Sequence, residues 1–272
     1  MNMLIKSANQ HLWARIRAGF NQYKPILYPY ILLMVRELER LSDDAQNTRN
    51  TVVHRRQLIE SILSVFEHTI DEQTAAFRVN KLLGHHRIDK ALTQRACLIA
   101  EQITPHIPPT SRVLSFGCGD GQVDWNIQNQ VASIQLYDVA DYRQPHVTLP
   151  FTTERKRLGN DFDVATLIAV WHHCIDYQDE ISWITKRVDQ LVVIESVLDD
   201  IMPWEVQAAI DWLYNRGMHA GANIPVPGHF HTVQEWEAIL AKHGFAVGSQ
   251  EDYGIDIPLV PEHHVLMVFN KQ

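Results

Sequence analysis

The 272-residue chain has few cysteines, no long hydrophobic run and no excess of positive charge. Its three cysteines, Cys97, Cys118 and Cys174, show no CxxC spacing, so the sequence predicts no disulfide framework and a reducing, cytoplasmic compartment. The N-terminal residues lack the apolar core of a signal peptide. The most apolar early stretch, residues 26–35, includes Pro29 and is shorter than the roughly 20 residues that cross a bilayer. We therefore expect a soluble protein without a membrane partner.

The charge balance is acidic, with 24 lysines and arginines against 32 aspartates and glutamates. Nucleic-acid binding depends on a net positive surface, and we find no basic stretch interleaved with aromatic residues. The sequence therefore predicts no nucleic-acid partner. Apolar residues at 46% and charged residues at 21% are typical of a globular protein and exclude a disordered or rod-like chain.

The chain has 15 histidines, including adjacent pairs at 85–86, 172–173 and 263–264. Adjacent side chains point about 100° apart on a helix and to opposite faces of a strand, so such pairs do not readily share a metal ion. The HExxH spacing of zinc proteases is also absent. We therefore expect no metal site and interpret most of these histidines as surface or supporting residues.

The first hundred residues have helical patterns, in segments near 25–41, 52–66 and 88–103, and prolines 105, 108 and 109 end this region. We expect residues 1–108 to form a helical extension or lid, and residues 109–272 to form an α/β domain. Apolar runs at 112–116, 133–138, 162–170 and 190–195 alternate with helical segments, which is typical of a doubly wound parallel sheet. Thr232 and Glu235 have the spacing of a capping box at a helix start.

A glycine cluster follows the first of these strands. Gly117, Gly119 and Gly121 form a GxGxG turn, and Asp138 ends the next strand, 17 residues after the last glycine. Such a turn brings backbone amides close to a ligand at the start of a helix, and the carboxylate can accept both hydroxyls of a ribose. The pattern predicts a nucleoside site. It matches neither the GxGxxG of dinucleotide folds nor the GxxxxGK[ST] of P-loops.

Residues 113–121, VLSFGCGDG, resemble motif I of class I S-adenosylmethionine-dependent methyltransferases. Residues 162–173, FDVATLIAVWHH, resemble the fourth motif of the small-molecule "type 11" group, and residues 228–245 resemble its late helix. The resemblance covers about residues 110–270. It implies a Rossmann-like sheet, mostly parallel with an antiparallel closing strand, that binds S-adenosylmethionine and methylates a small molecule. The residues it assigns to the cofactor are Phe116, Gly117, Cys118, Gly119, Gly121, Asp138, Val139 and Leu167.

Two features depart from this family. An acid that helps to hold the methionine ammonium of the cofactor usually stands where this chain has Ser115, so the ammonium must be held otherwise. Only about 23 residues separate Asp138 from Phe162, which leaves little room for the usual helix and third strand. The adenine-binding residues are therefore open, with residues 149–151 as a candidate.

Methyl transfer from a sulfonium is an in-line displacement that depends on positioning, and an oxygen acceptor also needs a base. His172 and His173 follow the strand that faces the methyl group, and we expect His172 before His173 as the general base. Alternatively, one of them bonds the backbone and the other packs under the N-terminal helices. Glu195 and Asp211 are the acids of interest near them. For the substrate wall the resemblance indicates Trp171, His219, His229 and His231.

Two other functions remain open at this stage. The chain can be a non-catalytic relative that binds a partner through its N-terminal helices, which Ser115 and the short middle section favour. It can also be an RNA methyltransferase, against which the acidic charge counts. Calorimetry with S-adenosylmethionine tests the first alternative, and salt-dependent association with tRNA or rRNA tests the second.

Overall fold

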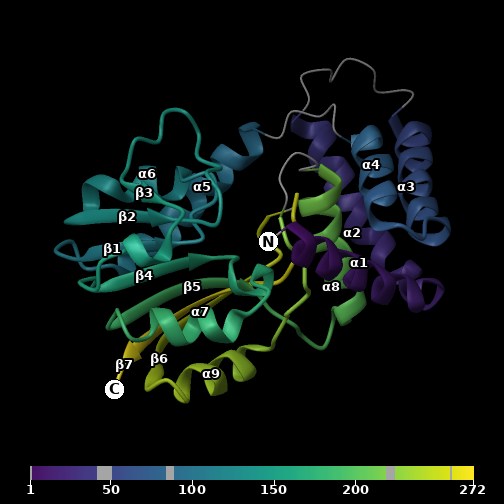
Figure 1. Cartoon of the computed structure of the whole chain (residues 1–272). Helices are drawn as coiled ribbons and strands as arrows, with labels where there is room; N and C mark the ends of the chain where they lie inside the picture. Colours follow the sequence, from purple (N-terminus) through teal and green to yellow (C-terminus); the bar gives the residue numbers. More distant parts are fainter. Residues whose placement is uncertain (1, 42–50, 84–88, 219–223, 258) are drawn as a thin grey trace.

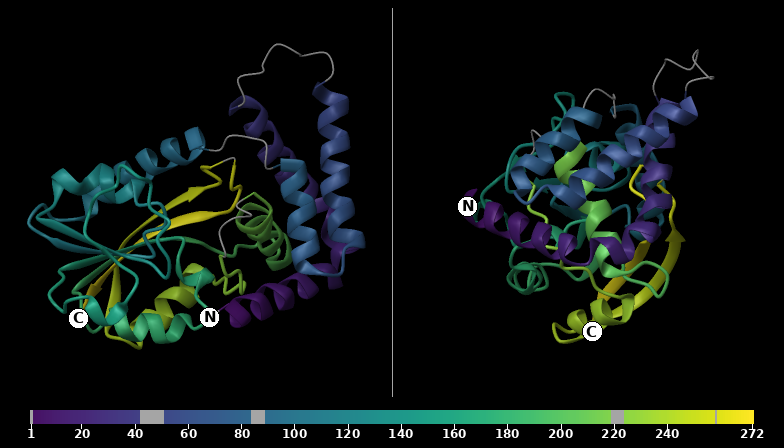
Figure 2. Two further views of the ribbon diagram at one scale, coloured as in Figure 1. Left: turned by 45° about the horizontal axis from the view of Figure 1, so that its top comes forward. Right: turned by 90° about the vertical axis from the view of Figure 1, so that its right-hand side faces the viewer.

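The computed structural model describes residues 2–41, 51–83, 89–218, 224–257 and 259–272. A seven-stranded sheet with helices on both faces lies beside a group of helices built mainly from the N-terminal part (Figure 1). The left view of Figure 2 separates the two parts, with the sheet on one side and the long helices on the other. The elements are α1 (Asn2–Ala18), α2 (Phe20–Leu41), α3 (Thr51–His68), α4 (Glu72–Leu83), α5 (Asp89–Ile103), β1 (Arg112–Phe116), α6 (Gln122–Ile127), β2 (Ser133–Tyr137), β3 (Phe151–Thr152), β4 (Val164–Ile168), α7 (Tyr177–Ile184), β5 (Gln190–Ser196), α8 (Trp204–Trp212), α9 (Val233–Ala241), β6 (Phe245–Gly254) and β7 (His264–Lys271).

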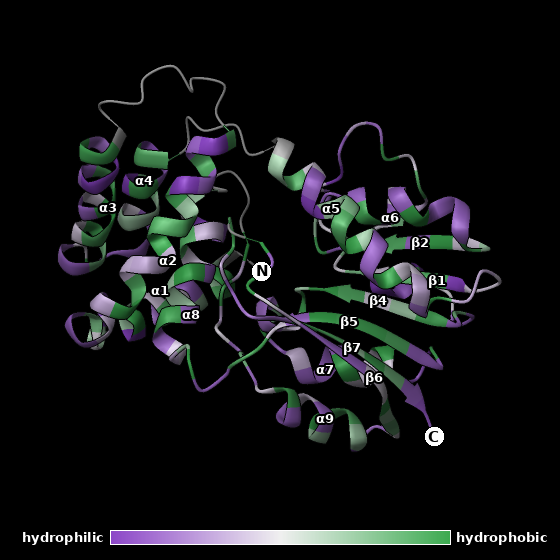
Figure 3. Ribbon diagram, turned by 180° about the vertical axis from the view of Figure 1, so that it is seen from behind, coloured by the Kyte–Doolittle hydropathy of each residue, from purple (hydrophilic) through white to green (hydrophobic). Residues whose placement is uncertain are grey.

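The strands are ordered β3-β2-β1-β4-β5-β7-β6. The strands from β3 to β5 pair in parallel, whereas β7 runs antiparallel to both β5 and β6. This order confirms the predicted doubly wound sheet with an antiparallel closing strand. The central strands are buried on both faces, and Figure 3 shows β4 and β5 as mostly hydrophobic ribbons. Buried strands of this kind explain the continuous apolar runs in the sequence.

Successive residues of each strand pack into two separate cores because side chains alternate between the faces of a sheet. On one face, Leu114 and Leu167 pack with α7 and α9 around Trp236. On the other face, Val113 and Val164 pack with α5 and α6. Helix α5 therefore lies on the sheet, as Figure 1 shows.

Helices α1 to α4 share a third core with α8. The ring centroids of Trp13 and Trp212 lie 4.3 Å apart, and Trp13 donates to the carbonyl of Thr69 at 3.0 Å. Glu72 is almost fully buried, and its carboxylate accepts hydrogen bonds from the Trp212 indole and from Arg216. The N-terminal helices thus pack on α8, which follows β5 in the chain, and α8 connects them to the sheet.

The short middle section holds a brief third strand but no helix before it. Strand β3 is two residues long and pairs with the end of β2, and no helix lies within residues 139–150, all of which are described. The helix that begins after Thr232 carries the predicted capping box, with bonds in both directions between Thr232 and Glu235. None of the helices in the described ranges is both long and apolar enough to cross a membrane.

Candidate functional site

The glycine turn lies at the carboxyl end of β1, where the strand order changes direction and where ligands of such sheets bind. Gly117, Gly119 and Gly121 all have positive φ angles, which side chains with a Cβ rarely adopt. A Cβ on Gly117 would approach Val170 to 2.7 Å, so this glycine also permits close packing of the turn against the end of β4. A Cβ on Gly119 would meet nothing within 4 Å, because that face of the turn is open.

Asp138, at the end of β2, faces the glycine turn and is 9% exposed. Its Oδ2 accepts a hydrogen bond from the Gly119 amide at 2.9 Å, and its Oδ1 accepts one from Val139 at 2.7 Å. Burial raises the pKa of this carboxyl, while the amides of Gly119, Val139 and Ala140 oppose that rise. The carboxylate therefore lies at the cavity rather than in bulk water, as a ribose-binding acid requires.

Ser115 and Asp124 form a buried pair below the turn. The Ser115 hydroxyl donates to Asp124 Oδ2 at 2.9 Å, and Asp124, in the first turn of α6, is 2% exposed. Burial raises the pKa of Asp124 to about 7, because no cation compensates its charge in the described structure. Both side chains line the same cavity as the glycine turn. Asp124 was not among the residues predicted from the sequence, although it is an acid three residues after the last glycine of the turn.

One continuous cavity of about 740 Å³ connects the glycine turn with the N-terminal helices and α8. This volume is within the usual range of small-molecule sites. Leu4 and Ile5 of α1 form one part of its wall, and Arg95 of α5 another. Helix α8 continues into a π-helical segment, Leu213–Met218, from which Tyr214 and Asn215 line the cavity. The N-terminal helices thus contribute directly to the site.

Glu195, at the end of β5, organises the turn that follows β4. Its Oε1 accepts from the backbone amides of Val170 and Trp171 at 2.9 and 2.7 Å. Its Oε2 lies 2.5 Å from His172 Nδ1, so the histidine is oriented with Nδ1 toward the acid and Nε2 toward the cavity. Burial lowers the pKa of His172, but the carboxylates of Glu195, Asp211 and Glu262 outweigh it and raise the pKa to about 9.

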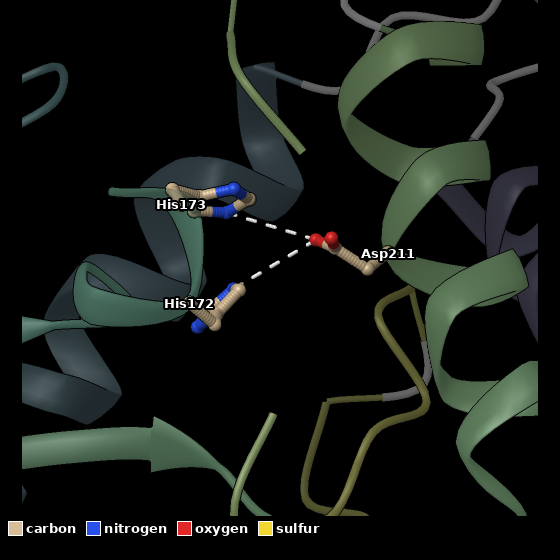
Figure 4. A group of neighbouring side chains, drawn as sticks. All are labelled: His172, His173 and Asp211. Atoms are coloured by element: carbon tan, nitrogen blue, oxygen red, sulfur yellow. Dashed lines mark ion pairs between the residues drawn. The ribbon is translucent and has the colours of Figure 1, made fainter. Parts of the chain in front are cut away.

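His173 lies beside His172, with ring centroids 4.1 Å apart. His173 Nδ1 is 2.9 Å from the carbonyl of Pro225, which requires Nδ1 to carry the hydrogen and leaves Nε2 as the acceptor. Burial lowers the pKa of His173, and the neighbouring charge of His172 lowers it further. The expectation that adjacent histidines face apart is therefore wrong for this pair, because both Nε2 atoms face Asp211 (Figure 4). Glu195 holds the ring of His172 through Nδ1, and the carbonyl of Pro225 holds that of His173.

The cluster contains an excess of buried acids. Glu195, Asp211 and Glu262 are each 2% exposed or less, and burial raises the pKa of both Asp211 and Glu262. Asp211 Oδ1 accepts from Asn215 at 2.6 Å, whereas its Oδ2 has no hydrogen-bond partner among the described residues. His264 Nε2 and Glu262 Oε1 are likewise without a partner in the described ranges. The part of the cavity wall formed by Asp211, Glu262 and His264 therefore contains buried polar atoms that have no hydrogen-bond partner in the described chain.

The structure brings most, but not all, of the predicted site residues to the cavity. Those that line it are Phe116, Gly117, Cys118, Gly119, Asp138, Val139, His172 and His173. Leu167 is fully buried in a sheet core, and its neighbours Ile168 and Ala169 line the cavity in its place. Gly121 packs with its Cα toward Val147 and is not part of the wall.

The predicted substrate wall lies mostly elsewhere. Trp171 is fully buried against Trp236, with ring centroids 5.2 Å apart. The rings of His229 and His231 pack 5.1 and 5.3 Å from Tyr177, outside the cavity lining of the described chain. His219 lies outside the described residues. Of the adenine candidates, Leu149 and Phe151 are partly buried against a sheet core and do not line the cavity, whereas Val139 and Tyr142 do.

The sheet order, the glycine turn and an acid at the end of the second strand together define a class I S-adenosylmethionine-dependent methyltransferase fold. A family model described as a methyltransferase domain matches residues 84–250, which is more than half of the chain. The chain therefore belongs to this methyltransferase family, whose cofactor is S-adenosylmethionine. No curated protein matches the sequence at a significant level.

Solved structures with a similar fold have low sequence identity to this chain. The magnesium protoporphyrin IX methyltransferase of Synechocystis PCC 6803 is 14% identical over 72% of this chain and 87% of its own, with a TM-score of 0.47. The 1,6-didemethyltoxoflavin-N1-methyltransferase of Burkholderia thailandensis is 15% identical over 68% and 80%, with a TM-score of 0.46. The YcgJ protein of Bacillus subtilis is 10% identical over 66% and 98%, with a TM-score of 0.49.

Proposed function

We propose that this protein transfers the methyl group of S-adenosylmethionine to a small-molecule acceptor that binds between the glycine turn and α8. The observation that carries this proposal is the single cavity that joins the nucleoside-binding strand ends to the histidine and carboxylate cluster. Bound S-adenosylmethionine supplies a methyl group on a positively charged sulfur. The chain has to hold that cofactor, align the acceptor opposite the sulfur and remove a proton.

Three groups are proposed to hold the cofactor. Asp138 accepts the ribose hydroxyls, the open face of Gly119 lies against the cofactor backbone, and Asp124 binds the methionine ammonium with Ser115 orienting it. The Asp124 proposal rests on its buried carboxyl, which has no cation near it in the described structure and accepts from Ser115, the residue in the strand position of the family's usual acid. Val139 and Tyr142 are the proposed neighbours of the adenine, since both line the cavity beyond Asp138.

His172 is the proposed general base for an acceptor hydroxyl. Its Nε2 faces the cavity, and Glu195 fixes the ring through Nδ1, which is the arrangement of a histidine oriented by a carboxylate. Because Glu195 and Asp211 favour the protonated imidazole, the base form and the rate are expected to increase toward alkaline pH. His173 is proposed to orient the acceptor from the adjacent position.

The N-terminal helices are proposed to act as a lid. Leu4 and Ile5 cover the cavity from α1, and Arg95 reaches it from α5, so these elements exclude water and select the acceptor. The acidic charge of the chain favours a small acceptor over RNA.

Calorimetry with S-adenosylmethionine, followed by measurement of S-adenosylhomocysteine release with a panel of small phenols, carboxylic acids and amines, tests the proposal. Binding of the cofactor with acceptor-dependent release of the product supports it. Absence of cofactor binding would favour the partner-binding alternative instead. Salt-dependent association with tRNA, together with release of the product only in its presence, would overturn the small-molecule assignment.

A further inference from the structure

We propose that His172, His173 and Asp211 form a binding site for a divalent transition-metal ion. This metal site is a second binding function of the cavity, in addition to the proposed methyl transfer. Three donor atoms, one from each side chain, lie within 4.8 Å of one another. Figure 4 shows both imidazoles pointing from one turn toward the carboxylate on α8.

The distances are close to those of a bound site. His172 Nε2 and His173 Nε2 lie 3.8 and 3.6 Å from Asp211 Oδ1. In a tetrahedral zinc site, bonds of about 2.0–2.1 Å separate the donor atoms by about 3.4 Å. Each histidine nitrogen would thus move only a few tenths of an ångström closer to Asp211 Oδ1 to reach this separation, while the two nitrogens start within 4.8 Å of each other. Two imidazoles and one carboxylate suit zinc, iron, cobalt or nickel better than magnesium or calcium.

Both histidines are held in the tautomer that a metal ligand needs. Glu195 accepts from His172 Nδ1, and the carbonyl of Pro225 accepts from His173 Nδ1, so the lone pair of each neutral ring is on Nε2. A bound ion would displace the proton that the surrounding carboxylates favour on His172, and the Asn215 amide, 3.5 Å from His173 Nε2, would turn aside. A carboxylate or a carbonyl behind the ring is the usual support of a metal-binding histidine. A pair of histidines that only fills space in a core would not need both Nδ1 atoms hydrogen-bonded and both Nε2 atoms directed at the same carboxylate.

The carboxylate has capacity for an ion. Asp211 is 1% exposed, and its Oδ2 has no partner among the described residues, although such buried oxygens normally have one. Glu262, whose Oε1 is also unpartnered in the described chain, adds a further buried acid to the cavity wall. A divalent cation would compensate the excess of negative charge, and the cavity leaves room for water or an acceptor on its open side.

His263 provides a contrast within the same chain. It also lies between two carboxylates, with Asp199 at Nδ1 and Asp252 at Nε2, at 2.5 and 2.7 Å. Both of its nitrogens are therefore engaged, and no lone pair faces a cavity. The His172 cluster differs because its Nε2 atoms converge at distances longer than a hydrogen bond on an acid with a free oxygen.

The lone pair of His172 Nε2 that would bind the ion is the one that would accept a proton from the acceptor. One site can therefore serve only one of these roles at a time. The metal site does not depend on the proposed methyl transfer, because metal affinity and cofactor affinity are measured in separate titrations. Its failure leaves the cofactor site untouched, and failure of cofactor binding leaves the metal site testable.

The test is a titration of the full-length, chelator-treated protein with Zn²⁺ by calorimetry and with Co²⁺ by visible absorption. We expect one site per chain that His173→Ala and Asp211→Asn each weaken by about 100-fold or more, and that Glu195→Gln weakens by about 10–100-fold. The matched control is His106→Gln, which removes a histidine paired with Glu251 away from the cavity and should leave the affinity within about twofold.

Circular dichroism and cofactor binding show which variants remain folded, and Glu195→Gln keeps the inference falsifiable if Asp211→Asn does not fold. If every variant among His173→Ala, Asp211→Asn and Glu195→Gln that remains folded bound the metal ion as tightly as the wild type does, the site would be overturned. An intense thiolate-to-cobalt band would also overturn it, because Cys174 lines the same cavity and would then be a ligand.

Discussion

The hydroxyl of Ser115 donates to the carboxylate of Asp124 across 2.9 Å, so a buried acid lies beside the strand position where the family's usual acid is missing. The two residues belong to β1 and to the first turn of α6. The acid of this pair therefore belongs to the helix, and the serine of the strand donates to it. This pair adds a buried acid to the cavity wall next to the glycine turn.

Asp124→Asn is expected to weaken the binding of S-adenosylmethionine by about 10–150-fold, because a hydrogen bond to a charged group is worth about 1.5–3 kcal/mol. Calorimetry measures this, with Asp161→Asn, an exposed aspartate before β4, as the control. Combining Ser115→Asp with Asp124→Ser returns the acid to the strand and should restore part of the affinity. An unchanged affinity in Asp124→Asn would contradict the assignment.

The affinity for S-adenosylmethionine should increase with pH up to about 7, the pKa to which burial raises Asp124. Below this pH the free protein holds a neutral carboxyl, and binding of the ammonium must displace its proton. Because α-amino groups lose their own proton near pH 8, the comparison is made between pH 5 and pH 7. Calorimetry in buffers of different ionisation enthalpy should detect proton release, and Asp124→Asn should abolish both the release and the slope.

Asp138→Asn should weaken cofactor binding by about tenfold or more, since an amide cannot accept from the ribose hydroxyls and from two backbone amides as a carboxylate does. The nearby control is Asp141→Asn, whose exposed side chain pairs with Arg143. Fluorescence or calorimetric titration provides the measurement. If both variants bound as the wild type does, the nucleoside would not lie at the end of β2.

His172→Gln should lower the rate of methyl transfer by about 10²–10⁴-fold with any oxygen acceptor, the usual contribution of a general base. Cofactor affinity should remain within about twofold, because His172 is proposed to act on the acceptor and not on the cofactor. Single-turnover release of S-adenosylhomocysteine separates the two effects, with His106→Gln as the control. A loss of cofactor affinity equal to the loss of rate would argue against a role in the chemical step.

Trp13→Ala should lower the free energy of unfolding by about 3–5 kcal/mol, because the indole packs on Phe66 and Trp212 in the core shared by α1 and α8. Urea denaturation measures this difference. Met3→Ala on the same helix is the control, since Met3 is 87% exposed and should change stability by about 0.5 kcal/mol or less. Equal free energies of unfolding for the two variants would mean that the packing of α1 on α8 does not stabilise the fold.

Local signals in the sequence were enough for the strand β1, the glycine turn, Asp138 and the capping box at Thr232. Each of these depends on side-chain periodicity or on bonds that span only a few residues, so neighbouring residues determine them. The shortened β3 also followed from chain length alone, because a helix and a full strand do not fit in so few residues.

Tertiary packing determined which residues face the cavity. Alternation along β4 sends Leu167 into a core and leaves Ile168 at the site, and the sequence does not say which face of the sheet a ligand covers. The convergence of His172 and His173 on Asp211 depends on Glu195 and on the carbonyl of Pro225, which anchor the two rings from different directions. Contacts between residues so far apart in the chain arise only when the helices of the N-terminal part pack with α8 beside the sheet, because no short-range preference fixes them.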